Sequence, residues 1–490
     1  MNLCNINHSF NYETEKLCRL FLPFEKINIL DYIEESELYA VTTVLQNEQK
    51  VTAELYINGK EYKSEKNIEK TKEDASKVLE RAIAVCLYNC FTNATGYTAK
   101  WGILTGVRPA KLYSSLVKSM GQTAAEQYFK DELLVSSEKV ELCRDTSVGE
   151  NMVINKSTPN SFSLYISIPF CPSRCAYCSF VSHSVEKSQK LIPDYLEKLL
   201  IEIELTAKIA KQNGLRLKTI YIGGGTPTTL SAEQLTAIMD CVKDNFDLTN
   251  LLEYTVEAGR PDTITEEKLI AIKNGGATRI SINPQTMNDA VLEAVGRRHT
   301  AKDAENAFIL ARKLGFNNIN MDLIAGLPSD TAESFKSSVD QIINLNPENV
   351  TVHSLSLKRA SNFNKNKVEQ FSNDGSDASD MVCYAKKALS DAGILPYYMY
   401  RQSKTIGNLE NVGYAKKGFE GYYNVYIMDE THTILACGAS AVTKLREPYG
   451  KTIERIFNYK YPYEYISGFD ELMARKAKIS EFYNRYSNKT

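Results

Sequence analysis

The sequence predicts an α/β protein whose centre is a partial (β/α)6 barrel of the TIM type, with an N-terminal α+β domain and a C-terminal α/β extension. Two observations carry this prediction. In the middle of the chain, short apolar runs alternate with helical patterns, and each conspicuous polar or glycine-rich motif there follows one of those runs. Because the chain has 490 residues, two or three domains are expected. We place them at residues 1–159, 160–357 and 358–490.

The N-terminal domain is predicted from two strand patterns and one helix pattern. Leu38–Leu45 and Lys50–Ile57 mix β-branched and apolar residues, and the Asn58-Gly59 pair that follows is a hairpin-type turn signal. A broad apolar face at helical spacing begins at Val78. These elements predict an α+β domain, but they identify no chemistry by themselves.

The central region is predicted to be a parallel sheet with helices between its strands. Its apolar runs are nearly continuous, which is typical of strands buried on both faces of a parallel sheet. Between them, Leu191–Ala210 and Thr331–Leu345 carry apolar residues at helical spacing. Right-handed crossovers would order the strands along the chain. The predicted strands are Phe162–Ile168, Leu217–Ile222, Tyr254–Val256, Thr278–Ile282, Ile319–Ile324 and Val350–Leu355.

Polar and glycine-rich motifs lie at the carboxyl ends of these predicted strands. In β/α barrels the active site is built from the loops at those ends. Chance does not readily place six motifs, spread over the whole region, each at a strand end, so we expect them to form one site. The motifs are the cysteine loop from Cys171, Gly223–Thr228, Glu257, Asn283–Gln285, Asp322 with Gly326–Pro328, and His353–Leu355.

The loop after the first strand holds Cys171, Cys175 and Cys178 in the spacing C-x3-C-x2-C. Iron–sulfur clusters are normally held by four thiolates, so three thiolates favour a 4Fe–4S cluster with one iron open to a small ligand. An open coordination position separates catalytic metal sites from closed structural ones. The alternative is a Cys3His zinc site completed by His183, which lies at ligand spacing after Cys178.

The other motifs are suited to a polar ligand beside that loop. The Gly223–Thr228 turn lets backbone approach a ligand closely, and it lacks the G-x4-G-K-[ST] pattern of a phosphate-binding loop. Glu257 ends an apolar strand, where a carboxylate is costly unless it is paired. Gln285 and Asp322 are also polar residues among apolar neighbours. For each, the structural alternative is a satisfied hydrogen bond at the end of a barrel.

Together these motifs resemble the radical S-adenosylmethionine (SAM) superfamily and, within it, the oxygen-independent coproporphyrinogen III oxidase family. The long N-terminal region with Trp101–Leu112 resembles a coproporphyrinogen dehydrogenase-like sub-branch of that family. The motifs occur in the same order over residues 161–356: Tyr165 with Pro169-Phe170-Cys171-x3-Cys175-x-Tyr177-Cys178, Gly223–Thr228, Val256-Glu257, Asn283–Gln285 and Met321–Pro328.

The resemblance implies a cofactor site. Cys171, Cys175 and Cys178 would hold a 4Fe–4S cluster, and the amino and carboxylate groups of SAM would occupy the open iron. Arg297 would pair with the SAM carboxylate, which a guanidinium fork fits well. The implied SAM contacts are Tyr165, Tyr177, Gly224, Gly225, Thr226, Glu257, Gln285, Arg297 and Asp322.

The resemblance also implies an activity. The protein would be an oxidoreductase of anaerobic porphyrin and haem biosynthesis that converts two propionates of coproporphyrinogen III into the vinyl groups of protoporphyrinogen IX. A 5′-deoxyadenosyl radical would start the reaction. A low-potential electron donor, such as a flavodoxin or ferredoxin, would be a partner.

One position departs from the best-characterised oxidases of the family. They carry a further cysteine two residues after the third cluster ligand, where this chain has Phe180 after Ser179. The Ser-Phe ending resembles family members that bind or transfer haem. A haem-binding or haem-transfer protein on the same scaffold is therefore the alternative function.

Propionate groups would be held by arginine or lysine, and three such residues lie near aromatic side chains. Arg108 and Lys111 follow Trp101, and Arg401 closes the aromatic run that starts at Pro396. We expect the C-terminal extension to cover the substrate. The structural alternatives are a helix–turn–helix with solvated basic ends for the first pair and a core strand for the second segment.

Composition excludes several classes of partner. Lys and Arg number 58 and Asp and Glu 60, so nothing draws the whole chain to nucleic acid or an anionic membrane. The first residues have neither a basic start nor an apolar core, which argues against a signal peptide. The longest apolar run, Ala82–Tyr88, is too short to span a bilayer. Eleven scattered cysteines favour a reducing compartment, so we expect a cytoplasmic protein.

Overall fold

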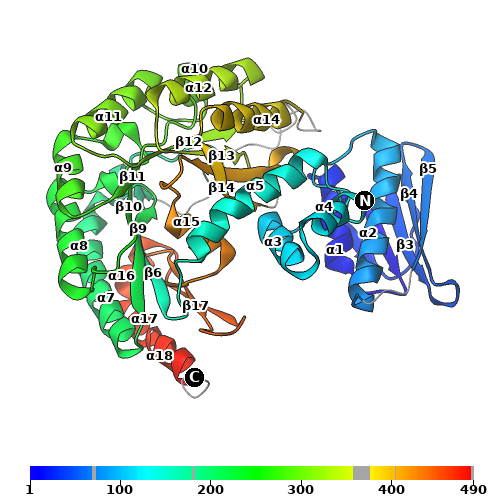
Figure 1. Cartoon of the computed structure of the whole chain (residues 1–490), viewed down its shortest axis with the longest axis horizontal. Coiled ribbons are helices and arrows are strands. Elements are labelled where there is room, and N and C mark those ends of the chain that lie inside the picture. Colours follow the sequence, from blue (N-terminus) through cyan, green and yellow to red (C-terminus); the bar gives the residue numbers. More distant parts are fainter. Residues whose placement is uncertain (69–72, 179–182, 357–375, 403, 487–490) are drawn as a thin grey trace. The chain divides into compact units, whose positions relative to one another are not determined.

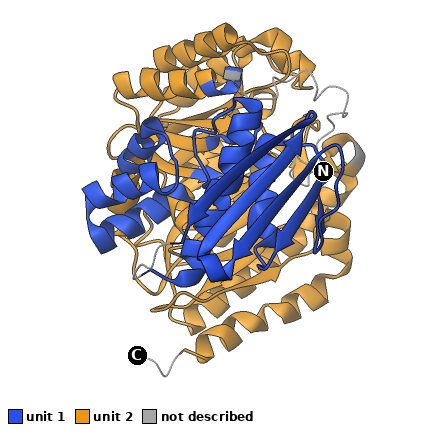
Figure 2. Ribbon diagram, turned by 90° about the vertical axis from the view of Figure 1, so that its right-hand side faces the viewer, with its two compact units in different colours: residues 1–145, 372–379, 400–410 blue, residues 146–371, 380–399, 411–490 orange. Residues whose placement is uncertain are grey.

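The structure is a computed structural model, and it describes residues 1–68, 73–178, 183–356, 376–402 and 404–486 (Figure 1). The chain divides into two compact units (Figure 2). Unit 1 comprises residues 1–145, 372–379 and 400–410, and unit 2 comprises residues 146–371, 380–399 and 411–490. The predicted three-domain division stays a prediction, and its second boundary, at residue 357, lies outside the described residues.

Unit 1 contains, in its described residues, a five-stranded sheet in the order β2-β1-β3-β4-β5. The predicted hairpin forms: β3 and β4 are antiparallel, and Asn58 and Gly59 turn the chain into β5 with φ of 53° and 75°. Both residues take the left-handed conformation that a two-residue hairpin turn requires. The strands are β1 (Asn2–Ile6), β2 (Asn28–Leu30), β3 (Tyr39–Leu45), β4 (Lys50–Ile57) and β5 (Lys60–Asn67).

Helices complete this unit. The apolar face of α2 packs on the sheet, where Val51, Leu55, Cys86 and Phe91 lie in one buried core. Burying such side chains contributes about 1.5–3 kcal/mol each to folding. The helices are α1 (Asn11–Phe21), α2 (Ala75–Thr95), α3 (Pro109–Met120), α4 (Gln122–Asp131) and α5 (Ser137–Ile154), the last of which continues into unit 2.

The six predicted central strands are present in unit 2, and adjacent strands among the six are parallel to one another. They lie side by side in chain order, as right-handed crossovers require. This arrangement confirms the predicted partial barrel. The strands are β6 (Ser161–Ile168), β9 (Arg216–Gly224), β10 (Glu253–Glu257), β11 (Arg279–Ser281), β12 (Ile319–Ala325) and β13 (Asn349–Ser354).

The crossover helices form a layer on the outer face of this sheet (Figure 1). Helix α7 buries Leu199 and Ile203 at helical spacing, as predicted, and it also buries Tyr195. Thr331 caps α12 by accepting a hydrogen bond from the Ser334 backbone. The helices are α7 (Ile192–Gln212), α8 (Ala232–Asn245), α9 (Glu266–Asn274), α10 (Asp289–Ala294), α11 (Ala301–Lys313) and α12 (Ala332–Leu345).

The C-terminal extension lengthens the barrel sheet at both edges. β15 (Glu410–Ala415) pairs antiparallel with β13, and β16 (Thr433–Cys437) pairs parallel with β6. Covering both edges removes the unpaired backbone that an open sheet would present. The full order among described strands is β14-β15-β13-β12-β11-β10-β9-β6-β16-β17-β18. The remaining elements are β7 (Phe170–Cys171), β8 (His183–Ser184), α6 (Val185–Ser188), α14 (Ser376–Asp391), β14 (Leu395–Arg401), α15 (Tyr422–Asp429), β17 (Val442–Arg446), β18 (Ile453–Phe457), α16 (Pro462–Ser467), α17 (Phe469–Arg475) and α18 (Ala477–Asn484).

A buried ion pair ties the end of the chain to the first barrel helix. Glu202 of α7 lies 2.8 Å from Lys476 and accepts hydrogen bonds from the Gly438 backbone and the Tyr465 hydroxyl, each at 2.7 Å. Both ionic side chains are almost fully buried, at 0% and 3% exposure.

In the described part of the chain, no helix has the length and apolarity to cross a bilayer.

Replacing Lys476 with Met should destabilise the protein strongly, because it leaves the Glu202 carboxylate buried without its cation. Breaking a buried pair in this way costs about 3–5 kcal/mol. The midpoint of thermal unfolding should fall by roughly 5 °C or more. Lys387→Met is the matched control, since Lys387 is 77% exposed and pairs with Asp391, which is 65% exposed. Equal midpoints of thermal unfolding for the two variants would contradict a stabilising role of the Glu202–Lys476 ion pair.

Candidate functional site

The loops that follow the parallel strands touch one another at one end of the barrel. The glycine turn after β9 contacts the cysteine loop, because the backbone amides of Gly225 and Thr226 donate to Ile168 and Phe170 at 2.8 Å each. On the other side of the barrel, the Gln285 backbone amide donates to the Asp322 carbonyl at 2.9 Å. The structure thus gathers the predicted motifs at one rim.

The glycine turn supports the first cysteine directly. A Cβ on Gly225 would lie 2.6 Å from the Phe170 carbonyl oxygen, closer than real Cβ atoms approach, and 3.0 Å from Cys171 Sγ, a tight contact. Gly224 has φ of 111°, which favours glycine. Thr226 Oγ1 donates to Cys171 Sγ at 3.4 Å. The glycines are therefore required for the loop to lie where it does.

The three thiols differ in exposure. Cys175 is 8% exposed, whereas Cys171 and Cys178 are partly buried. Among the described residues, no three His, Cys, Asp or Glu side chains gather around one point as the ligands of a single ion would. In a 4Fe–4S cluster each cysteine binds its own iron, so its thiolates stand farther apart than the ligands of one ion. Ser179 and Phe180 lie outside the described residues.

In the alternative Cys3His zinc site, His183 would be the fourth ligand. Its ring packs edge-on against Tyr461 and Tyr463, with ring centres at 5.7 and 6.3 Å. Its backbone pairs with Phe170 in the short β7–β8 ladder.

Tyr177 and Arg297 meet beside the cysteine loop. Arg297 Nη1 donates to the Tyr177 hydroxyl at 3.0 Å, and Nη2 donates to the Gly259 carbonyl at 2.9 Å. The side chain is buried, and within the described ranges its Nε has no hydrogen-bond partner. A buried guanidinium with a spare donor is suited to an anionic group.

Glu257 lies at the end of β10 against the first two strands. Tyr221 of β9 donates to its Oε1, and a Cβ on Gly223 would lie 3.0 Å from its Oε2. Burial raises the pKa of Glu257 to about 7, and although the Tyr221 hydrogen bond opposes this rise, the charge of Asp322 adds to it. The Glu257 carboxyl therefore titrates near neutral pH.

Gln285, in the loop after β11, lies beside Asp322 of β12. Gln285 takes a left-handed φ of 74°, and backbone hydrogen bonds with Asp322 and Ile324, each at 2.9 Å, hold it there. Its Oε1 is buried and has no partner among described residues. Burial opposes ionisation of Asp322, but its interaction with His353, 3.7 Å away, and the hydrogen bond from Asn320 outweigh burial and lower its pKa.

Tyr165 belongs to a stack of three tyrosines. Its ring centre lies 6.2 Å from those of Tyr221 and Tyr423, which are 4.5 Å apart. Sequence reasoning missed both partners. Tyr221 could have been found, because it stands opposite Tyr165 in the parallel register. Tyr423 comes from helix α15 and carries no local signal.

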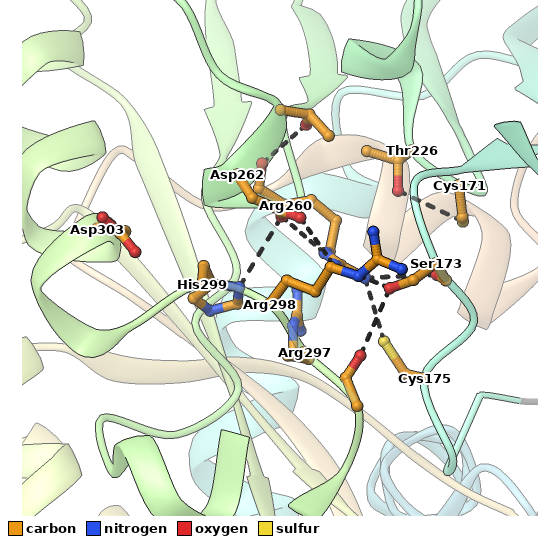
Figure 3. A network of polar contacts seen from close by, with 12 residues as sticks. Cys171, Ser173, Cys175, Thr226, Arg260, Asp262, Arg297, Arg298, His299 and Asp303 are labelled. Carbon is orange, nitrogen blue, oxygen red and sulfur yellow. Dashed lines mark hydrogen bonds and ion pairs between the residues drawn. The ribbon is translucent and has the colours of Figure 1, made fainter. Parts of the chain in front are cut away.

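Sequence reasoning also missed Arg260, Asp262 and His299, which lie beside the cysteine loop (Figure 3). The first two follow β10 by only a few residues. An arginine and an aspartate in a loop are usually solvated, so no local pattern indicates that Arg260 is buried and paired with Asp262 at the site.

The three predicted substrate residues all lie in unit 1. Arg108 precedes α3 and is partly buried, and Lys111 in its first turn is exposed. Arg401 is buried over the Trp101 ring, 5.2 Å from its centre, and donates to the Leu104 carbonyl. Contacts of these residues with a substrate stay predictions.

Comparisons with known proteins agree with the motifs. The Radical SAM superfamily model matches residues 165–342. The oxygen-independent coproporphyrinogen-III oxidase-like protein HemZ of Bacillus subtilis is 36% identical over 481 residues, which cover 94% of this chain and 96% of that protein. The heme chaperone HemW of B. subtilis is 42% identical over 39% of this chain and 50% of its own. Coproporphyrinogen III oxidase of Escherichia coli aligns over 67% of this chain and 73% of its own, with 21% identity and a TM-score of 0.48.

Replacing Gly225 with Ala should displace the cysteine loop, because the added Cβ would meet the Phe170 carbonyl and Cys171 Sγ. Disturbing the surroundings of metal ligands typically costs about tenfold or more in metal affinity. Iron bound per chain after anaerobic reconstitution should fall accordingly. Gly106→Ala is the control, since its Cβ would meet no atom closer than Leu104 Cδ1 at 4.0 Å. Full iron binding by the Gly225 variant would refute the inference that this glycine is required to position the cysteine loop.

Proposed function

As the motifs predicted, the chain belongs to the radical SAM superfamily, in its oxygen-independent coproporphyrinogen-III oxidase-like branch, and on that premise we propose that it is an oxidoreductase of anaerobic porphyrin and haem biosynthesis. Its reaction is the oxidative decarboxylation of two propionates of coproporphyrinogen III, which gives protoporphyrinogen IX. The observation that carries the proposal is the 36% identity to HemZ over 94% of the chain. The likeness therefore includes the regions outside the barrel.

The three cysteines fit a 4Fe–4S cluster by their chemistry and by the space around them. All three lie on one loop, and the absent Cβ of Gly225 leaves room beside Cys171 Sγ. The superfamily implies such a cluster together with SAM. When bound and reduced, this pair supplies a 5′-deoxyadenosyl radical and methionine. A low-potential flavodoxin or ferredoxin is the proposed electron donor.

The charges around the rim support a SAM site that has a cation on one side and oxygen acceptors on the other. Arg297 offers its spare Nε to a carboxylate. Glu257, Gln285 and Asp322 offer oxygen acceptors suited to an amino group and ribose hydroxyls. We propose the remaining SAM contacts to be Tyr165, Tyr177, Gly224, Gly225 and Thr226.

In the proposed reaction each propionate loses one hydrogen atom, one carbon dioxide and one electron, and a vinyl group remains. The bound cofactors would supply the 5′-deoxyadenosyl radical that would take the hydrogen atom, and a one-electron acceptor would take the electron. The part of this chain is to orient the propionate and to exclude water from the reacting carbon. Arg108 and Lys111 are the first candidates to hold propionates. Arg401 follows them, because its Nη1 and Nη2 groups already donate to backbone carbonyls.

A haem-binding or haem-transfer function is the second candidate. Heme chaperones of B. subtilis and E. coli are 42% and 30% identical to 39% and 62% of this chain. The Ser179-Phe180 ending of this chain, which resembles that of family members that bind or transfer haem, also supports this candidate. This candidate expects stoichiometric haem binding with little decarboxylation.

The turnover test uses anaerobically reconstituted protein with SAM, a reductant and coproporphyrinogen III. Protoporphyrinogen IX and 5′-deoxyadenosine should both form, and Cys178→Ala should abolish both products. Cys241→Ala is the matched control, because that cysteine is also partly buried but lies on α8. Deoxyadenosine without a vinyl product would overturn the substrate, and tight haem uptake without turnover would favour the second candidate.

A further inference from the structure

Arg260 turns its guanidinium toward the cysteine loop (Figure 3). Its Nη1 donates to Cys175 Sγ at 3.5 Å, and its Nη2 donates to Ser173 Oγ at 3.2 Å. The residue is 4% exposed. A permanently charged group is thus held, out of water, against the middle cysteine of the loop.

Asp262 fixes the orientation of this guanidinium. Its Oδ1 and Oδ2 accept hydrogen bonds from Arg260 Nε and Nη2, each at 2.9 Å, in a two-pronged pair. His299 lies behind the carboxylate, with Nδ1 4.0 Å from Asp262 Oδ1. Burial, with the charge of Arg297 adding to it, lowers the pKa of His299 to about 4, so this ring adds no charge near neutral pH.

The geometry leaves one edge of Arg260 for the loop. Nε and one Nη2 proton serve Asp262, and the other donors face Ser173 and Cys175. A thiol is a weak acceptor, whereas an iron-bound thiolate carries negative charge and accepts a stronger, charge-assisted hydrogen bond. Arg260 is therefore placed to interact more strongly with the loop when Cys175 binds iron.

We propose that Arg260 is a positioning residue for the cluster: it donates to the Cys175 thiolate, fixes that ligand, and makes the reduction potential less negative. The proposal rests on the proposed function, since it takes Cys175 as an iron ligand. Hydrogen bonds and positive charge near cluster sulfurs stabilise the added electron. Asp262 offsets part of the charge of Arg260. Removing the charge of Arg260 should therefore make the reduction potential more negative, and removing the charge of Asp262 should make it less negative.

The variants for the test are Arg260→Gln, Arg260→Lys, Asp262→Asn and Arg298→Gln. Arg298 is the matched control because it is 63% exposed and pairs with Glu186, which is 64% exposed. It loses the same charge from the same region, but at a site screened by solvent and salt. Arg260→Lys keeps the charge but not the planar fork, so it should lie between wild type and Arg260→Gln.

The measurement is an EPR-monitored redox titration of each reconstituted full chain, with iron content determined in parallel. Arg260→Gln should shift the potential to a more negative value and Asp262→Asn to a less negative one, each by about 59 mV, a tenfold change in a one-electron equilibrium. Arg298→Gln should match wild type.

Unchanged potentials in both the Arg260 and Asp262 variants, with full iron, would overturn the proposal. Shifts of the same sign in both would do so too, because they would indicate general loosening of the site. If Arg260→Gln retains no iron, the sign of the Asp262→Asn shift decides. Wild-type protein that binds no cluster would instead refute the proposed function itself.

Discussion

Parallel pairing of β6 with β9 brings Ile168 opposite Gly224, and this register puts the cysteine loop against the glycine turn. In that position the loop backbone receives hydrogen bonds from Gly225 and Thr226. Because β10 to β13 follow in the same direction, the loops after them reach the same rim. The geometry of the candidate site is thus a consequence of strand register, and a slip of one residue would turn its side chains to the opposite face.

Charge is divided across this rim. Arg260 and Arg297 lie beside the cysteine loop, both buried, while Glu257 ends β10 and Asp322 lies within β12, farther along the sheet. In the proposed site, the cysteine thiolates and the SAM carboxylate would lie among cations. The SAM amino group and ribose hydroxyls would lie among oxygen acceptors. Burial makes such interactions stronger than in water, but it also makes each unpaired charge costly. This balance explains why Arg260 is held by Asp262 and why Glu257 has a raised pKa.

Much of this arrangement could be predicted from sequence, because the central strands are near-continuous apolar runs and their ends are marked by glycine or polar residues. The edges of the sheet could not be predicted. Pairing of β16 with β6 joins segments some 270 residues apart, and no local pattern records it. The same limit hid Tyr423, which reaches the tyrosine stack from α15. Arg260 was hidden differently, since its sequence context is that of a solvated loop and only its burial reveals its role.

The proposed function requires that three thiolates on one loop leave a cluster iron open for SAM. EPR of the anaerobically reduced, reconstituted protein, recorded with and without SAM, is a direct test of this requirement. We expect a 4Fe–4S signal whose g values change when SAM is added, because SAM would bind the open iron. Zinc in place of iron, or a cluster signal that SAM leaves unchanged, would contradict it.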